Sequence, residues 1–418
     1  MKKGDDTADE FALLRQSAEA GDVAAQFTLG QAYHRGATGV TAYQPTAIAW
    51  YFKAASTGHV EAQANLGAIF LEKAAASRAA GDADKARTWL NKAAAQGHVE
   101  AMYHLGILMH QGYGMPQMSK AARGWLEAAA NKGYDIALNQ LGLMAADSGD
   151  HAAAAKWFAA GAARGEAHAQ YSLARCLQDG TGVKRDPAEA ARWFLLAAEQ
   201  DLPEAQYCLG LMMLEGEGVP KSRKQAQRWF QQAATRGEPN AQFETAEGFR
   251  IGRGTEVDLG RALAFFRMAA DQNHVAAQFS LGAMLESGAG LREPKLPDAA
   301  AMYRRAAQGG HRDAAHNYGI MLARGIGVKA DRQFARQVLE YAISLGADAA
   351  MPTLGYLLMN EGDLVAAAQL TYLALQREPD GQGRKLLDAL RTHLPQEALA
   401  DAEKRAKHWR RKPVSIDW

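Results

Sequence analysis

The sequence has few cysteines, few aromatic residues and no excess of charge of either sign. Two cysteines in 418 residues exclude a disulfide-stapled scaffold and a zinc-ribbon framework. Lys and Arg total 47 against 46 Asp and Glu, and this net charge of +1 gives no field that would attract nucleic acid or an anionic membrane. Aromatic residues make up 8% of the chain while alanine occurs 88 times, which favours closely packed helices over β-structure.

Long apolar runs are also missing. The longest uncharged apolar stretch, 205–214, is about half the length of a membrane span. Lys2 and Lys3 are followed by acidic residues, whereas a secretory signal would continue with an apolar segment. We therefore expect a soluble cytoplasmic protein, or a periplasmic or secreted one if the N-terminus has been trimmed.

The chain repeats itself at a period close to 36 residues. A motif of the form Ala-Gln-x-x-Leu-Gly recurs, with substitutions, in ten copies, and so steady a period is the signature of a solenoid. The copies begin at Ala25, Ala62, Ala101, Ala137, Ala169, Ala205, Ala241, Ala277, Ala314 and Ala350.

Each copy contains two helical patterns. Ala205, Leu209 and Met213 form the apolar face of a first helix. Ala190, Trp193, Ala197 and Ala198 form a similar stripe on a second helix. We expect this stripe to be buried, so that Trp193→Ala costs about 3–5 kcal/mol. The same aromatic position recurs as Trp50, Trp89, Trp125, Trp157, Trp229 and Phe265.

Glycines and helix caps punctuate each copy. Gly210 lies inside the first helix and recurs in most copies, which indicates a close approach by a neighbouring helix. Loops such as 180–183 (Gly-x-Gly-Val) predict tight turns with positive φ. Asp186 then suits the N-cap of the second helix and Pro187 its first position. In the second, fourth and tenth copies, Asp82, Asp150 and Asp363 are expected to provide that cap.

The first-helix motif, the Gly-x-Gly-Val loop and the Trp-x-x-x-Ala-Ala helix together resemble the Sel-one-like repeat, a relative of the tetratricopeptide repeat. The likeness covers residues 11–409. It implies a right-handed α-solenoid whose first helices line a concave face, and a binding scaffold rather than a catalyst. The fourth copy looks closer to a tetratricopeptide unit, and the ninth and tenth are degenerate.

The same resemblance predicts the organisation of the chain. We expect a flexible N-terminus over 1–10, the repeats over 11–392, a C-terminal capping helix over 393–412 and a tail over 413–418. Within the repeat region, 11–20 is expected to be a lone second helix that covers the first full repeat, because a terminal repeat needs a polar outer face.

One position of the first helix is a candidate binding site. By tetratricopeptide-like geometry, the residue two before the motif leucine points toward the concave groove, and an aromatic row there suits a peptide or a helix. The alternative interpretation, that these rings only pack on the next repeat, stays open. The predicted site residues are Phe27, Tyr103, Tyr171, Tyr207, Phe243, Phe279 and His316.

Polar residues surround that row. Glu61, Glu100 and Glu204 lie three residues before it, and Arg250 and Glu286 lie seven residues after it. The acidic residues either favour the helix dipole or contribute to a groove that selects a partner with apolar and basic side chains.

The sequence contains no catalytic signature. It lacks the ending of a phosphate loop, a Gly-x-Ser-x-Gly elbow and a His-Glu-x-x-His helix. The four histidines that begin first helices are interpreted as turn residues rather than metal ligands, and Cys176 and Cys208 as apolar fillers. We expect no enzyme, metal or cofactor. The four histidines are His59, His98, His274 and His311.

The predicted function is therefore a non-enzymatic scaffold or adaptor that holds a partner peptide or helix on its concave surface. Nucleic acid is not an expected partner, and no integral membrane segment is expected. One alternative is an adaptor that uses its convex face or the basic cluster within 404–412. That cluster also has a structural explanation, because cations stabilise a helix C-terminus. A second alternative is a binder of a small molecule or a cell-wall fragment.

Overall fold

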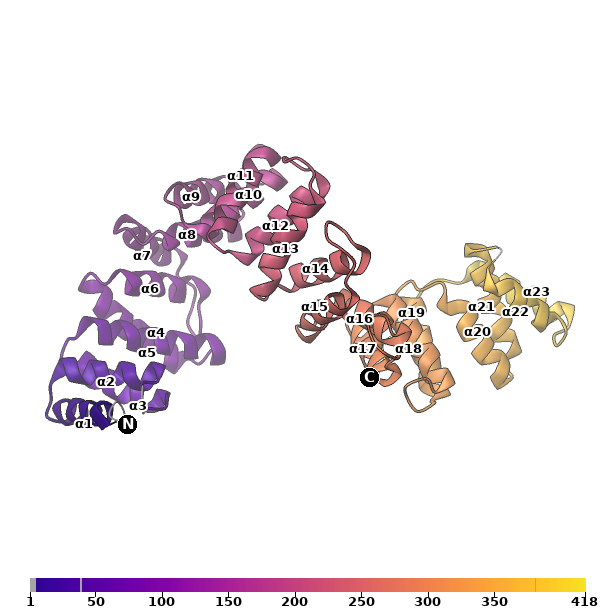
Figure 1. Cartoon of the computed structure of the whole chain (residues 1–418), viewed down its shortest axis with the longest axis horizontal. Helices are drawn as coiled ribbons and strands as arrows, with labels where there is room; N and C mark the ends of the chain where they lie inside the picture. The colour runs from indigo at the N-terminus through magenta and orange to yellow at the C-terminus, as the bar shows by residue number, and fades with distance from the viewer. Residues whose placement is uncertain (1–4, 38–39, 380) are drawn as a thin grey trace. The chain divides into compact units, whose positions relative to one another are not determined.

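The computed structural model describes residues 5–37, 40–379 and 381–418, all of the secondary structure being helical apart from one isolated bridge. The chain is an all-α solenoid, as predicted, and divides into two compact units, 1–202 and 203–418. Within each unit every helix packs against its neighbour in the sequence, except for the last two helices, which both pack against the helix before them (Figure 1). Among the described residues, each helix is too short or too polar to cross a membrane.

The first unit holds a leading helix and five helix pairs. The leading helix is α1 (Asp5–Glu19). The pairs are α2 (Val23–Arg35) with α3 (Gln44–Ser56), α4 (Val60–Ser77) with α5 (Ala80–Ala95), α6 (Val99–Gln111) with α7 (Ser119–Asn131), α8 (Ile136–Asp147) with α9 (His151–Ala163), and α10 (Ala167–Asp179) with α11 (Pro187–Glu199).

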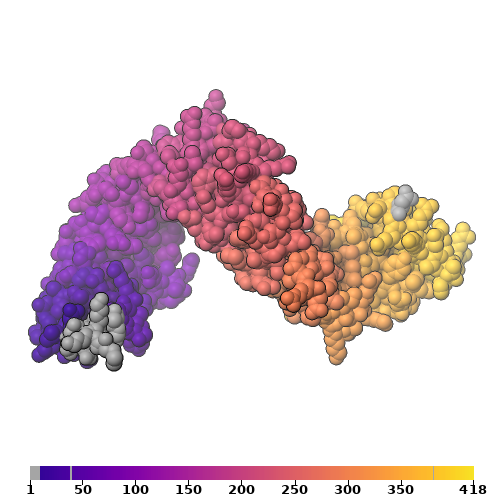
Figure 2. Space-filling model, in the orientation of Figure 1, coloured from indigo at the N-terminus to yellow at the C-terminus, as the bar shows by residue number. Residues whose placement is uncertain are grey.

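The second unit holds five further pairs and two closing helices. The pairs are α12 (Pro203–Glu215) with α13 (Arg223–Thr235), α14 (Pro239–Ile251) with α15 (Leu259–Asp271), α16 (Val275–Ser287) with α17 (Leu296–Gln308), α18 (Arg312–Arg324) with α19 (Arg332–Ser344), and α20 (Ala350–Glu361) with α21 (Leu364–Arg377). The closing helices are α22 (Gln382–Arg391) and α23 (Gln396–His408). Within each unit the surface colour changes gradually from one pair to the next (Figure 2), as expected when each repeat touches only its neighbours.

The ends differ in detail from the predicted boundaries. Helix α1 begins at Asp5, so part of the stretch predicted to be flexible is helical, while residues 1–4 lie outside the described residues. Helix α23 lies within the segment predicted for the C-terminal cap and buries Ala402 and Ala406. Helix α22, inside the predicted repeat region, belongs to no repeat pattern and was not anticipated.

The turn chemistry follows the prediction in most copies. The Asp186 carboxylate accepts hydrogen bonds from the backbone N–H groups of Ala188 and Glu189, with Pro187 at the first helical position. Asp150 and Asp363 also cap their helices. Asp82 does not: the chain already turns at Arg78, a left-handed residue with φ of 54°, and Asp82 lies inside the first turn of α5.

The first helix approaches the second at the recurrent glycine, as predicted. A Cβ atom added to Gly210 would lie 2.6 Å from Cε1 of Phe230, and one added to Gly282 would lie 2.8 Å from Cδ1 of Tyr303. Leucine takes the place of the ring in the second and third copies, against Gly67 and Gly106. The glycine therefore makes room for a large core side chain of the partner helix.

For most copies the prediction that the recurrent tryptophan fills the core is wrong by one residue, whereas Trp89 is buried in the core as predicted. Trp193 is half-buried, and its indole N–H donates to Glu189 at 3.4 Å, whereas Phe194 is fully buried. The same holds for Trp229 and Phe230. The tryptophan therefore covers the edge of the core that the following residue fills.

Buried glutamines connect several repeats to the one before them. The Gln242 amide donates to the carbonyl of Ala234, at the end of α13, and its oxygen accepts from Gln272, at the end of α15. Gln63 does the same with Ala55 and Gln96. In these two repeats the motif glutamine is a hydrogen-bonded buried polar group that fixes the register of successive repeats.

Two glycine substitutions test the close approach. Gly210→Ala should lower the free energy of unfolding, because the new methyl group meets Phe230 and the ring has no room to move. Gly124→Ala, on α7 with open space around it, should instead raise that free energy by about 0.5–1 kcal/mol through helix propensity. Urea denaturation followed by circular dichroism measures both, and equal shifts in the same direction would contradict the contact.

A second pair of variants tests the position of the core. Phe194→Ala should cost about 3–5 kcal/mol, since it leaves a cavity, whereas Trp193→Ala should cost only about 1–2 kcal/mol. Hydrogen exchange should show the loss first in α10 and α11. A larger cost for Trp193→Ala would place the tryptophan in the core after all.

Candidate protein-binding surface

The seven predicted site residues occupy equivalent places in their repeats. Each lies on the first helix of its repeat and is half-buried. In the first unit these are Phe27 on α2, Tyr103 on α6 and Tyr171 on α10. In the second unit they are Tyr207 on α12, Phe243 on α14, Phe279 on α16 and His316 on α18.

The buried side of most of these rings rests on the core aromatic of the same repeat. The ring centroids of Tyr207 and Phe230 are 5.9 Å apart, and those of Phe243 and Phe266 are 5.8 Å apart. Phe27, Tyr171 and Phe279 make the same contact with Tyr51, Phe194 and Tyr303. Aromatic pairs at such distances add to stability, so packing is one role of these rings.

The histidines that begin first helices stack against three of these rings. Phe279 stacks on His311 with centroids 4.2 Å apart, and Phe243 stacks on His274 at 5.0 Å. Phe27 stacks on His59 in the same way. Because the histidine belongs to the next repeat, each ring is held between two repeats.

These histidines are helix caps, in agreement with their predicted role as turn residues. His274 Nδ1 accepts from the backbone N–H of Ala277 at 3.1 Å, and His59, His98 and His311 cap their helices in the same way. In other copies Asp22, Glu166 or Glu238 has this position and role. No group of three or more potential metal ligands occurs in the part of the chain that the structure describes.

Acidic groups border the rings of the second unit. Glu244, next to Phe243, forms a 2.5 Å ion pair with Arg253, and both side chains are about one-fifth exposed. Burial, together with the carboxylates of Glu244 and Glu238, raises the pKa of Tyr207 to about 12, so its hydroxyl is neutral and can donate a hydrogen bond.

One pocket joins two of the predicted inner-face residues. Phe279 and Arg250 line a pocket of about 430 Å³ together with Ser280 and Ala283 of α16. The Arg250 guanidinium is held by Glu247 at 2.7 Å. This pocket provides an apolar wall and a fixed charge pair at the exposed side of an aromatic row.

Comparison with known proteins decides the family. The Sel1 repeat model matches residues 23–59, 60–98, 99–134, 167–202, 203–238, 239–274, 275–311 and 312–346, well over half of the chain. The chain belongs to the Sel1 repeat family. Sel1 repeat proteins generally mediate protein–protein interactions and are typically non-catalytic.

Solved structures agree with this fold. A protective antigen present in uropathogenic Escherichia coli strains, described as an SLR fold, is 26% identical with a TM-score of 0.52, over 95% of this chain and 94% of that one. A Sel1 repeat protein from Oxalobacter formigenes is 29% identical with a TM-score of 0.43, over 81% of this chain and 87% of that one. None of the curated proteins compared matches the sequence.

The Sel1 matches also refine the view of individual copies. The segment 135–166, predicted to be closer to a tetratricopeptide unit, is not matched. The ninth copy, predicted to be degenerate, is matched over 312–346, while the tenth is not. Tyr318 replaces the motif leucine of the ninth copy and is nevertheless buried, so an aromatic ring is accommodated there.

The other candidate groups have structural surroundings. Cys176 and Cys208 are half-buried, and burial raises the pKa of the Cys176 thiol. In the basic C-terminal cluster, Arg405 pairs with Asp401, Lys407 with Glu403, and Arg411 with Asp348. Much of that cluster is therefore neutralised by neighbouring carboxylates.

Sequence reasoning missed a pocket of the second unit that lies among α19, α20, α21, α23 and the tail. The feature of the sequence that could have indicated this pocket is Leu370. This residue lies seven after the Asp363 cap, where Trp193 follows Asp186 in the fifth copy. A smaller side chain at that position leaves space.

The capping histidines predict a specific pH dependence. Burial lowers the pKa of His274 and of His311, because the charged ring loses hydration there, and the neutral ring is the form that accepts the capping hydrogen bond. The stability they contribute is fully present above the unfolded-state pKa of about 6.5 and is lost as the pH falls toward the lower folded-state pKa. The midpoint temperature of thermal unfolding should therefore fall as the pH is lowered from about 7.5 to 5.5.

The matched control is His274→Asp with His311→Asp, since Asp22 caps the first copy. This double variant should lose less stability than the wild type over the same pH interval, because a carboxylate stays ionised there. NMR titration of the two rings gives a direct test. A pKa at or above 6.5 for either ring would refute the capping argument for that residue.

Proposed function

We propose that the protein is a scaffold that binds a partner peptide or helix along the first-helix surface of its repeats. The partner carries apolar and basic side chains. The observation that supports this most directly is the pocket in which Phe279 and Arg250 meet, because it offers an apolar anchor site beside fixed charges.

The setting of the rings favours recognition in addition to packing. Most of the rings are supported from below by a core aromatic, and in three repeats also from the side by a capping histidine. A ring held in one orientation loses little conformational entropy when a partner covers its exposed edge.

Charge favours a basic partner. The carboxylates of Glu244 and Glu238 act on Tyr207, and Glu204 is exposed one turn before it. A Lys or Arg of the partner would be attracted to these groups while its apolar neighbours cover the rings.

Alanine substitution of the rings would be an ambiguous test, since each ring also packs on the core. A better variant is Ala283→Arg, which fills the pocket beside Phe279 and adds a positive charge. The equivalent position of the fifth copy is naturally Arg175, so the fold tolerates arginine there.

The matched control is Ala301→Arg on the exposed face of α17, where the equivalent residues of the fifth and sixth copies are Arg192 and Arg228. We expect affinity capture from the native cell to recover a partner with the wild type and with Ala301→Arg, and to lose it with Ala283→Arg. Circular dichroism of all three proteins controls for folding. Equal capture by both variants would move the partner away from this surface.

A further inference from the structure

The tenth repeat differs from the others at both aromatic positions of its second helix. Leu370 stands where most copies have tryptophan, and Thr371 stands where the fifth to seventh copies have a fully buried phenylalanine. Leu386 of α22 fills the core instead, since a Cβ atom added to Gly355 would lie 2.7 Å from its Cδ2. The space beside Leu370, which a tryptophan occupies in other copies, is left unfilled.

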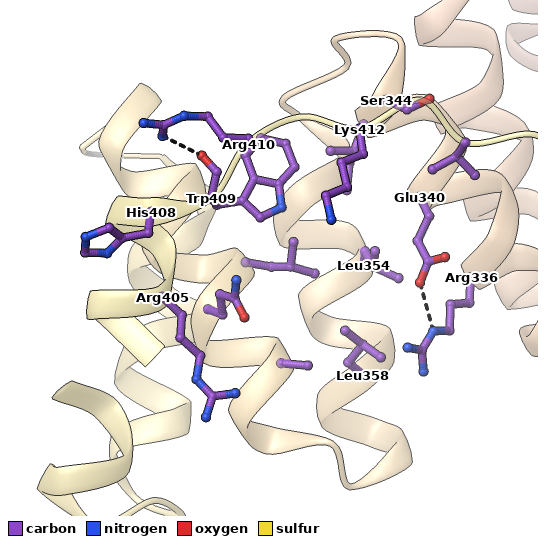
Figure 3. A pocket seen from close by; sticks show the side chains of 15 residues that line it. Arg336, Glu340, Ser344, Leu354, Leu358, Arg405, His408, Trp409, Arg410 and Lys412 are labelled. Carbon is purple, nitrogen blue, oxygen red and sulfur yellow. Dashed lines mark hydrogen bonds and ion pairs between the residues drawn. The ribbon is translucent and has the colours of Figure 1, made fainter. Parts of the chain in front are cut away.

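That open space is a pocket of about 700 Å³. Figure 3 shows α20 beneath it with Leu354 and Leu358, α19 on one side with Arg336 and Glu340, and α23 on the other with Arg405 and His408. The volume is within the range of pockets that bind small ligands.

The C-terminal tail closes the upper side and is itself anchored. The Arg411 guanidinium donates to Asp348 at 2.7 Å, and Trp418 packs against Tyr318, Phe334 and Tyr341. Between these two anchors the tail contributes Lys412 and Val414 to the pocket wall. The tail therefore shapes the pocket.

The floor of the pocket is hydrocarbon. Leu354, Leu358 and Leu370 lie next to Ile343 and Ala366, and the indole of Trp409 covers one side (Figure 3). A peptide backbone in this place would need a partner for each N–H and C=O group, and the lining has only one amide side chain, Gln369, and one hydroxyl, Ser344. An alkyl chain has no such requirement.

The charged side chains that line the pocket differ in whether they have an ion-pair partner. Arg336 is paired with Glu340 at 3.0 Å, and Arg405 with Asp401 at 2.7 Å. Arg410 donates to the carbonyl of Trp409. Lys412 has no ion pair with any carboxylate of the described residues, and its amine points into the pocket (Figure 3). Lys412 thus offers a cation above the apolar floor, and Arg410 likewise has no ion pair among the described residues.

We propose that this pocket binds a small amphipathic anion, a carboxylate or phosphate ester that carries an alkyl chain. The anionic group contacts Lys412, with Arg410 and His408 nearby, and the chain lies on the leucines of α20 and α21. This site is separate from the first-helix surface proposed for protein partners, so either can fail without the other.

The test is isothermal titration of the full chain with decanoate and with decyl phosphate, with decanol as the uncharged control. The wild type should bind one equivalent of either anion, and decanol about tenfold or more weakly, since the charge-assisted contact is missing. Failure of both anions to bind at millimolar concentration would overturn the proposal.

Two variants locate the site. Lys412→Gln should weaken binding of the anions about tenfold or more. Leu370→Trp restores the residue of other copies and should abolish binding by filling the pocket. The control is Lys407→Gln, because Lys407 is exposed, paired with Glu403 and outside the pocket. Equal effects of Lys412→Gln and Lys407→Gln would overturn the proposal, and Lys412→Gln decides the matter if Leu370→Trp does not fold.

Two further arms separate the sources of such an anion. The protein could instead cosediment with phosphatidylglycerol vesicles but fail to bind decanoate. If Lys412→Gln and Lys407→Gln then reduced cosedimentation equally, the contact would be with the membrane surface, and the pocket proposal would be overturned. An apolar tripeptide with a free carboxylate that binds more tightly than decanoate would overturn the alkyl assignment in favour of a protein C-terminus. Decanoate binding that depends on Lys412, with or without vesicles, supports the proposal.

Discussion

The close contact between a glycine of the first helix and a large side chain of the second helix sets the geometry of the repeat. Where Gly210 has no Cβ atom, the ring of Phe230 lies against the backbone of α12. Because the ring is large and rigid, it fixes the separation of the two helices. Tyr207 rests on that same ring, and so the depth at which it sits in the surface follows from the core contact. The candidate binding surface is in this sense an outward extension of the core.

Polar groups transfer this geometry from one repeat to the next. Gln242 connects the end of α13 with the end of α15 through two hydrogen bonds, and His274 caps α16 while it stacks on Phe243 of the preceding repeat. These hydrogen bonds join two neighbouring repeats, so the interface between them gains a fixed register. It follows that the surface of one repeat is complete only when the next repeat is present. A recognition surface built in this way is preorganised over several repeats at once.

Local chemistry made most of the fold predictable, and its limits explain the errors. The Asp186 cap, Pro187 and the glycine turns depend on residues close in sequence, so they could be inferred from the sequence alone. The tryptophan could not be placed correctly, because Phe194 fits the apolar stripe of Ala190, Ala197 and Ala198 as well as Trp193 does. A period of 3.6 residues does not distinguish adjacent positions, and only contact with the glycine of the facing helix does. Helix α22 and the early turn at Arg78 follow no repeat motif, which is why neither was anticipated. The aromatic row was found by position, but its support by the capping histidines depends on contacts between repeats.

The last repeat shows how the same constraint can be released. In an inner repeat the two adjacent aromatic positions of the second helix serve packing, one in the core and one at its edge. The tenth repeat is followed by capping helices, and α22 supplies Leu386 to the core from outside the pair. The positions of Leu370 and Thr371 are then free to carry smaller residues, and the solenoid remains packed. The space that results cannot close, because α19 and α23 are held in place by their own contacts on either side, and the anchored tail covers it. A pocket is thus the expected consequence of ending a stack of repeats whose inner members have fully packed cores. The side chains that line this pocket are not constrained by the repeat motif.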